Sequence, residues 1–137
     1  MKEIVLDAKV DNLPQLLSII DEELENAGCS MKGQMQIDVA VEEIFVNISR
    51  YAYIEEPGKV IIRGNVAAEP PHTVTLAFED EGKAFNPLER KPPDLTPAVR
   101  RHKVGGLGIF LVRSMSDDIS YERREGKNIL TIKKNLL

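Results

Sequence analysis

A carboxylate and an amide stand one helical turn apart in a largely apolar stretch of the sequence. Glu43 and Asn47 lie in residues 37–48, IDVAVEEIFVNI, where a helix places both on one face and turns Glu42 about 100° away. An amide oxygen suits Mg²⁺, which takes one or two ligands from protein and the rest from phosphates and water. The carboxylate can orient or deprotonate a group that attacks a phosphate. The structural alternative is a polar pair that stabilises an exposed helix face.

A second motif follows the apolar residues 73–78. Asp80, at the end of this predicted strand, can accept a hydrogen bond from an exocyclic amine such as adenine N6, and Gly82 lets a planar base approach the backbone. With Phe85 and Pro87 the pattern is Asp-x-Gly-x-x-Phe-x-Pro. The alternative is an ordinary surface turn, because Asp and Gly are common turn residues.

Glycines form a third motif in residues 105–108, GGLG. Gly105, Gly106 and Gly108 end an irregular segment and open a predicted helix. Backbone N–H groups at a helix start favour a phosphate, and glycine lets the phosphate come close. This is neither a Rossmann fingerprint nor a P-loop, because the glycines follow a polar loop and no Gly-Lys-Ser/Thr is present. A flexible helix entry is the plain alternative.

The periodicity of the chain predicts the elements that position these motifs. A loop of about 20 residues between 81 and 105 holds four of the eight prolines, and residues 86–104 are expected to act as a lid. Strands paired as hairpins with helices on one side predict an α+β two-layer sandwich with a mixed, mostly antiparallel sheet. The expected strands are residues 3–8, 59–67, 73–80, 119–125 and 128–134. One expected helix begins near Leu13 and stops at Gly28, and two others cover residues 31–53 and 105–116.

Composition narrows the class of protein. The 137 residues suit one domain, 1–137, and the net charge of −4 argues against nucleic-acid binding as the main activity. The single cysteine, Cys29, cannot build a disulfide framework or a cysteine-rich zinc site. The first ten residues lack the apolar run of a signal peptide, and no stretch approaches transmembrane length. A cytoplasmic protein without a membrane partner is therefore expected.

The three motifs, in this order, resemble the nucleotide site shared by gyrase, the heat-shock-90 chaperone, histidine kinases and MutL. The match covers about residues 36–116. Nothing in the sequence supplies the phosphorylated-histidine hairpin of histidine kinases or the transducer domains of the others. As a stand-alone domain, the chain is similar to the anti-sigma-factor serine/threonine kinases of bacteria, above all in residues 40–53, AVEEIFVNISRYAY.

The resemblance implies roles for individual residues. Asn47 is the implied metal ligand, Glu43 the catalytic carboxylate, and Asp80 and Gly82 the adenine contacts. The chain departs from the family where Lys127-Asn128 replaces a common Gly-Thr, and where Val104 replaces an arginine before the phosphate loop. Arg50 and Tyr51 also stand where many members have a histidine or a small residue. The expected nucleotide-binding set is Asn47, Asp80, Gly82, Phe85, Arg101, Lys103, Gly105, Gly106, Leu107, Gly108 and Asn128.

The same resemblance implies the cofactors ATP and Mg²⁺ and a reaction. The γ-phosphoryl group of ATP would pass to a serine or threonine of a small anti-sigma-antagonist protein. Such kinases also bind a sigma factor, often form homodimers and are commonly opposed by a phosphatase. Two alternatives remain open: a nucleotide-gated module that sequesters a partner without phosphorylating it, and an ATPase domain that serves a larger signalling system.

Overall fold

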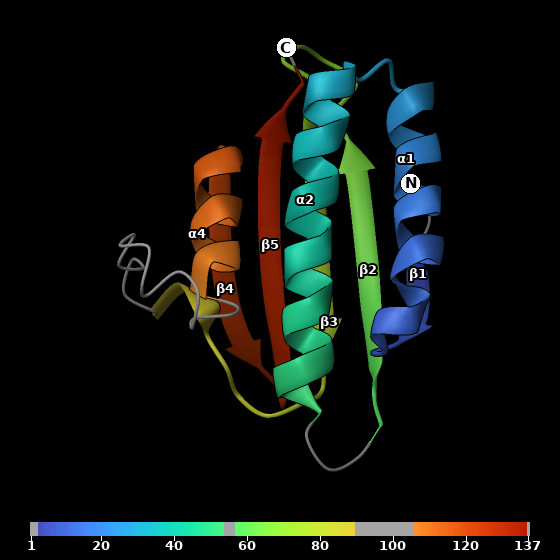
Figure 1. Ribbon diagram of the computed structural model, residues 1–137. Coiled ribbons are helices and arrows are strands. Elements are labelled where there is room, and N and C mark those ends of the chain that lie inside the picture. Colours follow the sequence, from blue (N-terminus) through green and yellow to red (C-terminus); the bar gives the residue numbers. More distant parts are fainter. Residues whose placement is uncertain (1–2, 54–56, 90–105, 137) are drawn as a thin grey trace, which may run out of the picture.

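The computed structural model describes residues 3–53, 57–89 and 106–136 as an α+β protein (Figure 1). Two 3₁₀ turns, Val10–Asn12 and Pro87–Glu89, and a π-helical turn, Ile48–Ala52, supplement the regular elements. The helices are α1 (Leu13–Asn26), α2 (Met31–Asn47) and α4 (Gly106–Met115), and the strands are β1 (Ile4–Asp7), β2 (Lys59–Val66), β3 (Thr73–Asp80), β4 (Asp118–Arg124) and β5 (Lys127–Asn135).

The strands form one sheet in the order β1-β2-β3-β5-β4. All four pairings between them are antiparallel. The α+β class is thus confirmed, whereas the expected mixture of parallel and antiparallel pairs is not seen in the described sheet. The reason is that β5 returns beside β3 in the opposite direction, and this register sets Asp80 directly opposite Asn128.

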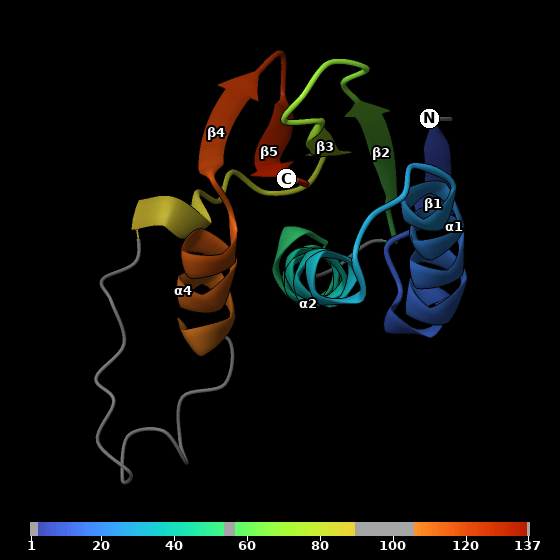
Figure 2. The same ribbon diagram turned by 90° about the horizontal axis from the view of Figure 1, so that it is seen from above.

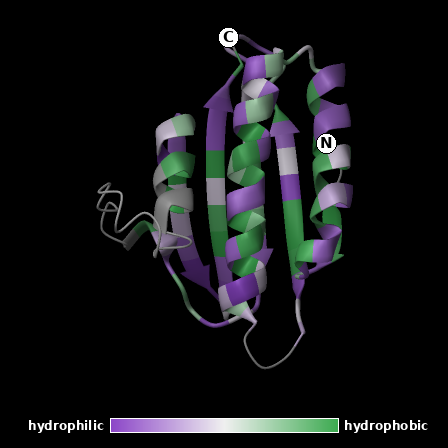
Figure 3. Ribbon diagram, in the orientation of Figure 1, coloured by the Kyte–Doolittle hydropathy of each residue, from purple (hydrophilic) through white to green (hydrophobic). Residues whose placement is uncertain are grey.

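The helices cover one face of the sheet, which gives two layers (Figure 2). The central helix α2 lies between α1 and α4 and buries Ile37, Val41, Ile44 and Phe45 against the strands. Along α1 the buried positions recur at helical spacing, and its C-terminal half is largely hydrophilic (Figure 3). In the described part of the chain, no helix has both the length and the apolar character needed to cross a membrane.

Local signals explain where α1 and α2 begin and end. Gly28 follows α1 with a φ of 77°, the left-handed conformation in which glycine commonly ends a helix. The hydroxyl of Ser30 accepts a hydrogen bond from the Gly33 N–H, 3.1 Å away, and caps the start of α2. The expected helix 31–53 is regular only to Asn47, after which it widens into the π-helical turn.

Candidate functional site

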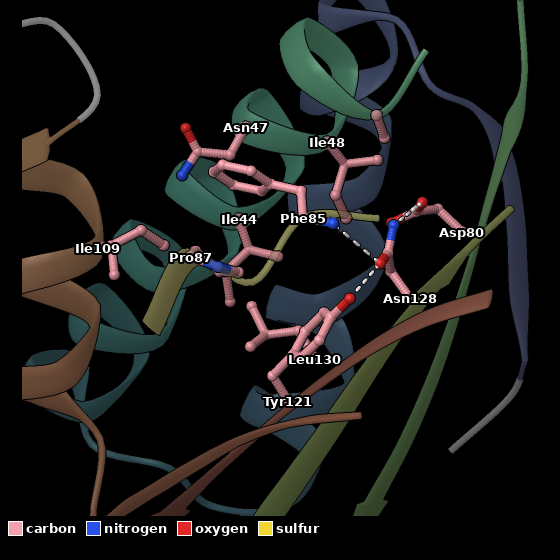
Figure 4. Close-up of a pocket in the computed structure, with 11 residues that line it drawn as sticks. Ile44, Asn47, Ile48, Asp80, Phe85, Pro87, Ile109, Tyr121, Asn128 and Leu130 are labelled. Atoms are coloured by element: carbon pink, nitrogen blue, oxygen red, sulfur yellow. Dashed lines mark hydrogen bonds between the residues drawn. The ribbon is translucent and has the colours of Figure 1, made fainter. Parts of the chain in front are cut away.

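A pocket opens between α2, the ends of β3 and β5, and α4 (Figure 4). Apolar side chains from the helices and from β5 form most of its wall, and three polar side chains, Asn47, Asp80 and Asn128, enter it. Mostly apolar concavities with a few convergent polar groups are typical small-molecule sites. The lining residues are Ile44, Asn47, Ile48, Ala52, Asp80, Phe85, Pro87, Ile109, Tyr121, Asn128 and Leu130.

Asn47 is buried without full hydrogen bonding. Its side chain is only 7% exposed, and its amide nitrogen Nδ2 has no hydrogen-bond partner within the described residues. Leaving a buried polar group unpaired costs about 1–3 kcal/mol, so such a group in a pocket wall calls for an explanation. The unpaired Nδ2 donor, one helical turn beyond Glu43, could donate to an acceptor on a bound ligand.

Glu43 is half-buried on the same helix, next to the exposed Glu42. Burial raises the pKa of the Glu43 carboxyl, the charge of Glu42 adds to this shift, and the charge of Arg50 opposes it. A carboxylate with a raised pKa suits proton transfer near neutral pH. Glu43 does not line the pocket of Figure 4 itself, so its predicted catalytic role stays a prediction.

Asp80 is the buried acceptor at the end of β3, with 4% of its surface exposed. Its Oδ1 atom accepts hydrogen bonds from the Gly82 N–H and from the Asn128 amide, both 2.9 Å away. Burial raises the pKa of Asp80, while these two hydrogen bonds and the charge of Arg123 act against the increase. Asp80 is thus a buried acceptor in the pocket wall, and its contact with an exocyclic amine stays a prediction.

Gly82 packs against the end of the π-helical turn. A Cβ atom at this position would lie 2.2 Å from the carbonyl oxygen of Ala52, closer than non-bonded atoms approach. The same carbonyl accepts a hydrogen bond from Lys83 N–H at 2.9 Å. The widened turn thus directs a backbone carbonyl at the loop after β3. The structure gives Gly82 a packing reason that the sequence did not reveal, in addition to the predicted access for a base.

Asn128 joins three parts of the site (Figure 4). Its amide nitrogen donates to Asp80 Oδ1 and to the Lys83 carbonyl, 2.8 Å away, and its oxygen accepts from the Phe85 N–H, 3.3 Å away. The hydroxyl of Tyr121 also donates to this oxygen. The sequence predicts a site role for Asn128 but not for Tyr121, whose sequence signal is limited to its place in the predicted strand 119–125.

Phe85 lies between Asn128 and Asn47 in Figure 4, with its N–H bonded to Asn128 and its ring beside Asn47. Its ring centroid is 5.9 Å from that of Tyr51 at an angle of 31°. Aromatic pairs at such separations contribute beyond their buried area. After Tyr121, Tyr51 is thus a second residue beside the pocket that the sequence did not predict. In the sequence, Tyr51 is only a departure from the family pattern.

The predicted phosphate loop is described in part. Gly106, Leu107 and Gly108 form the first turn of α4, where backbone N–H groups have no partner within the helix. An anion at this end would be stabilised by these groups and by the helix dipole. The predicted contacts Arg101, Lys103 and Gly105, and most of the lid 86–104, lie outside the described residues.

The donor set limits which metal the site can hold. Within residues 3–53, 57–89 and 106–136 there is no group of three or more His, Cys, Asp or Glu side chains arranged to hold a metal. Magnesium bound chiefly through phosphates needs only one or two protein oxygens. The side-chain oxygen of Asn47 can be such a ligand.

Comparison with protein families places this geometry among nucleotide-binding domains. Residues 6–134 match the family model of the histidine kinase-like ATPase domain. The serine-protein kinase RsbW of Bacillus thuringiensis (strain Al Hakam) is 31% identical over 99 residues, covering 69% of this chain and 60% of that relative. RsbW of Bacillus subtilis (strain 168) is 27% identical over 93% of this chain and 84% of its own length. The first of these matches thus spans less than two thirds of the relative's length.

Solved structures share the fold. The RsbU and RsbW domains of a Mycobacterium tuberculosis protein match with a TM-score of 0.67 at 13% identity, over 99% of this chain and 33% of that one. The SiaB–SiaC complex of Pseudomonas aeruginosa matches with a TM-score of 0.56 at 12% identity, over 96% and 88% of the two chains. At these identities the structural matches establish the fold alone.

Proposed function

Because this chain belongs to the histidine kinase-like ATPase family, we propose that it is an ATP-dependent protein serine/threonine kinase. ATP would bind with its base beside Asp80 and its phosphates toward the start of α4. The γ-phosphoryl group would pass to a serine or threonine hydroxyl of a protein partner. The observation that carries the proposal is the buried, partly unpaired amide of Asn47 in the wall of a pocket that also contains Asp80.

Asn47 is the proposed protein ligand for Mg²⁺. Its side-chain oxygen provides one hard ligand, and the nucleotide phosphates and water complete the coordination. When bound, the ion neutralises charge on the phosphate oxygens. The chain itself contributes the N–H groups at the start of α4, which would donate to the phosphate oxygens.

Glu43 is the proposed general base for phosphoryl transfer. The acceptor hydroxyl oxygen forms a bond to the γ-phosphorus while the bond from that phosphorus to the β–γ bridging oxygen breaks, leaving ADP. The hydroxyl proton passes to the Glu43 carboxylate. The raised pKa of this carboxyl improves the match to a proton acceptor that works near neutral pH, and Arg50 keeps the charged form accessible.

The proposed protein substrate is a small antagonist of an anti-sigma factor, and a sigma factor is the proposed second partner. The Bacillus relatives are named serine-protein kinases, which supports the reaction class. A reversing phosphatase, a homodimeric state, a cytoplasmic location and a single domain over residues 1–137 belong to the same proposal. The alternative, a nucleotide-gated binding module, requires the same pocket but no transfer by Glu43.

Two neighbouring carboxylates make a matched test of the reaction. Purified chain is incubated with Mg²⁺, labelled ATP and small proteins of the antagonist class, and phosphoserine and phosphothreonine are mapped by mass spectrometry. Glu43→Gln is expected to lower the transfer rate by about a hundredfold or more while ATP still binds. Glu42→Gln removes an equal charge from the exposed side of α2 and is expected to retain activity.

The outcomes separate the two functions. ATP binding with no Glu43-dependent label on any acceptor would favour the binding module and refute the kinase. Absence of ATP binding altogether would refute both.

A further inference from the structure

One oxygen of Asp80 is already fully engaged. Oδ1 accepts two hydrogen bonds of 2.9 Å, from Gly82 N–H and from the Asn128 amide. Within the described residues no hydrogen bond reaches Oδ2. Only 4% of the Asp80 surface is exposed. A base in the pocket would therefore meet one carboxylate oxygen that already accepts two hydrogen bonds and one that accepts none from the described residues. An ionised carboxylate oxygen only accepts hydrogen bonds, so its position decides which edge of a base it favours.

The orientation of the Asn128 amide is fixed by backbone groups that can act only as a hydrogen-bond donor or only as an acceptor. Its oxygen receives the Phe85 N–H, which can only donate, and its nitrogen faces the Lys83 carbonyl, which can only accept. The Tyr121 hydroxyl occupies the remaining acceptor position of the oxygen. Because Asn128 is only 5% exposed, a flipped amide would set acceptor against acceptor at Asp80 without access to water. All four hydrogen-bonding positions of the side chain are therefore used by the protein.

From this arrangement we infer that Tyr121 and Asn128 are positioning residues that set the base preference of the pocket. They hold Asp80 so that Oδ2 accepts from a 6-amino purine and rejects a 6-oxo purine. The inference rests on the proposed nucleotide site and goes beyond it, because neither residue has to touch the nucleotide. A 6-oxo group would place its oxygen against the carboxylate oxygen, where neither can donate a hydrogen bond. A site built to accept a hydrogen bond from an amine discriminates strongly against a ligand that lacks this amine.

The contribution of Tyr121 acts through Asn128. Its hydroxyl is on β4, and β4 pairs with β5 so that Tyr121 lies opposite Leu130, two residues from Asn128 along that strand. Without this hydroxyl the amide loses one of the two donors that hold its oxygen. The Asn128 nitrogen is then less firmly directed at Asp80, and the carboxylate gains freedom to rotate. Selectivity for the base should fall more than affinity for the shared triphosphate.

The experiment compares ATP with inosine triphosphate, whose base carries an oxygen at position 6 in place of the amine. Calorimetry on the full chain with Mg²⁺ gives the selectivity ratio, which is the dissociation constant for inosine triphosphate divided by that for ATP. Tyr121→Phe is expected to reduce this ratio about tenfold, the effect of weakening one hydrogen bond to a charged group. Asp80→Asn, which introduces a donor at the same place, should reduce it further.

Asn128 is tested by substitution with threonine and with valine, two side chains that share one shape. Thr and Val differ by a hydroxyl in place of a methyl group, so Asn128→Thr retains a donor beside Asp80 and Asn128→Val does not. The ratio should be partly preserved in Asn128→Thr and lost in Asn128→Val. A role in folding alone would not distinguish ATP from inosine triphosphate. Tyr121→Phe provides the test by itself if Asn128→Val fails to fold.

Tyr53→Phe is the matched control. The Tyr53 hydroxyl accepts from Glu81 N–H and donates to the Lys59 carbonyl, both at 2.8 Å, so it holds the same loop through backbone groups other than those that bond to Asp80 and Asn128. Its removal should lower the melting temperature and leave the ratio unchanged. An unchanged ratio in Tyr121→Phe and in Asn128→Val would overturn the inference while ATP binding persists. Failure of the unsubstituted chain to bind ATP would overturn the proposed function and the inference with it.

Discussion

At the scale of single residues, Asn47 combines a cost in stability with a use in binding. The buried amide nitrogen has no partner in the described structure. Apolar residues surround it, including Ile44 and Ile48 from the same helix. A leucine of similar size would suit these surroundings better. The amide therefore lies where binding is favoured at the expense of stability of the free protein.

Asn47→Leu is expected to change stability and binding in opposite directions. The free energy of unfolding of the nucleotide-free protein should rise by about 1 kcal/mol, because an unpaired buried amide is removed. Mg²⁺-dependent ATP affinity should fall at least about tenfold, equivalent to about 1.4 kcal/mol. Urea denaturation and calorimetry with and without Mg²⁺ measure the two effects.

A serine on the same helix end is the control for Asn47. The Ser49 hydroxyl bonds back to the Phe45 carbonyl, 2.9 Å away, and does not line the pocket. Ser49→Ala should leave ATP affinity unchanged. A loss of stability in Asn47→Leu with unaltered ATP affinity would contradict the metal-ligand assignment.

At the scale of elements, the site depends on the point where α2 widens. The sequence predicted a helix over 31–53 and its apolar stripe correctly. A change of winding depends on tertiary contacts, here between the Ala52 carbonyl and Lys83 N–H, and leaves no periodic signal. The contact between Gly82 and Ala52 joins residues 30 positions apart, so local patterns could not reveal it.

Gly82→Ala tests that contact. The added Cβ would meet backbone atoms of Ala52, which cannot rotate away, so the end of α2 or the loop after β3 must shift. We expect a loss of about 1–3 kcal/mol in unfolding free energy together with weaker ATP binding. Gly33→Ala is the comparison, because a Cβ there meets only side-chain atoms of Cys29 and Ser30. Full ATP affinity in Gly82→Ala would show that the contact does not shape the pocket.

Helices α1 and α2 also share a carboxyl pair, Asp21 and Asp38. Burial, followed by the hydrogen bond with Asp21 and the charge of Asp21, raises the pKa of Asp38 to about 7. One oxygen of each carboxyl is buried without a partner among the described residues. The folded state therefore retains a proton that an unfolded aspartate, with a pKa near 3.8, would release. Between these two values the folded protein binds more protons, so its stability falls as pH rises from about 4 to about 7.

Asp38→Asn is expected to remove this dependence. The variant should match the original protein near pH 4 and exceed its stability above pH 7. Because the pair is partly exposed, solvent screening limits the gain to about 1 kcal/mol. Denaturation curves from pH 4 to pH 8 measure the slope. Glu22→Gln, on the exposed side of α1, is the control, and an unchanged slope in Asp38→Asn would exclude the pair as its source.

At the scale of the whole molecule, the hairpins and the α+β class followed from the sequence because their signals are local. The turn between β4 and β5, Glu125-Gly126, has φ of 53° and 76°, as a two-residue hairpin requires. The pairing of β3 with β5 is different, because it joins Asp80 to Asn128 across 48 residues and a helix. The expected nucleotide-binding set includes Asn47, Asp80, Phe85 and Asn128 of the eleven lining residues, and only the register sets Asp80 opposite Asn128.

Nucleotide binding should stabilise the whole chain, since both sheet and helices contribute to the pocket. At a concentration of Mg-ATP about 100 times the dissociation constant, the expected gain is about 2.7 kcal/mol. A melting temperature that rises by several degrees with Mg-ATP, and less with ATP and EDTA, is the expected result. Inorganic triphosphate in place of ATP controls for binding of the phosphates alone. No shift at saturating Mg-ATP would contradict a pocket built from the core.

The distribution of aromatic residues around the pocket has an optical consequence. The chain has no tryptophan and three tyrosines. Tyr51 packs on Phe85, Tyr121 bonds to Asn128, and Tyr53 holds the loop after Asp80. Two of the three tyrosines, Tyr51 and Tyr121, therefore contact residues that line the pocket, and Tyr53 serves as the internal reference. The unlabelled chain carries its own fluorescent reporters of an occupied pocket, and substituting each tyrosine in turn would show which wall responds.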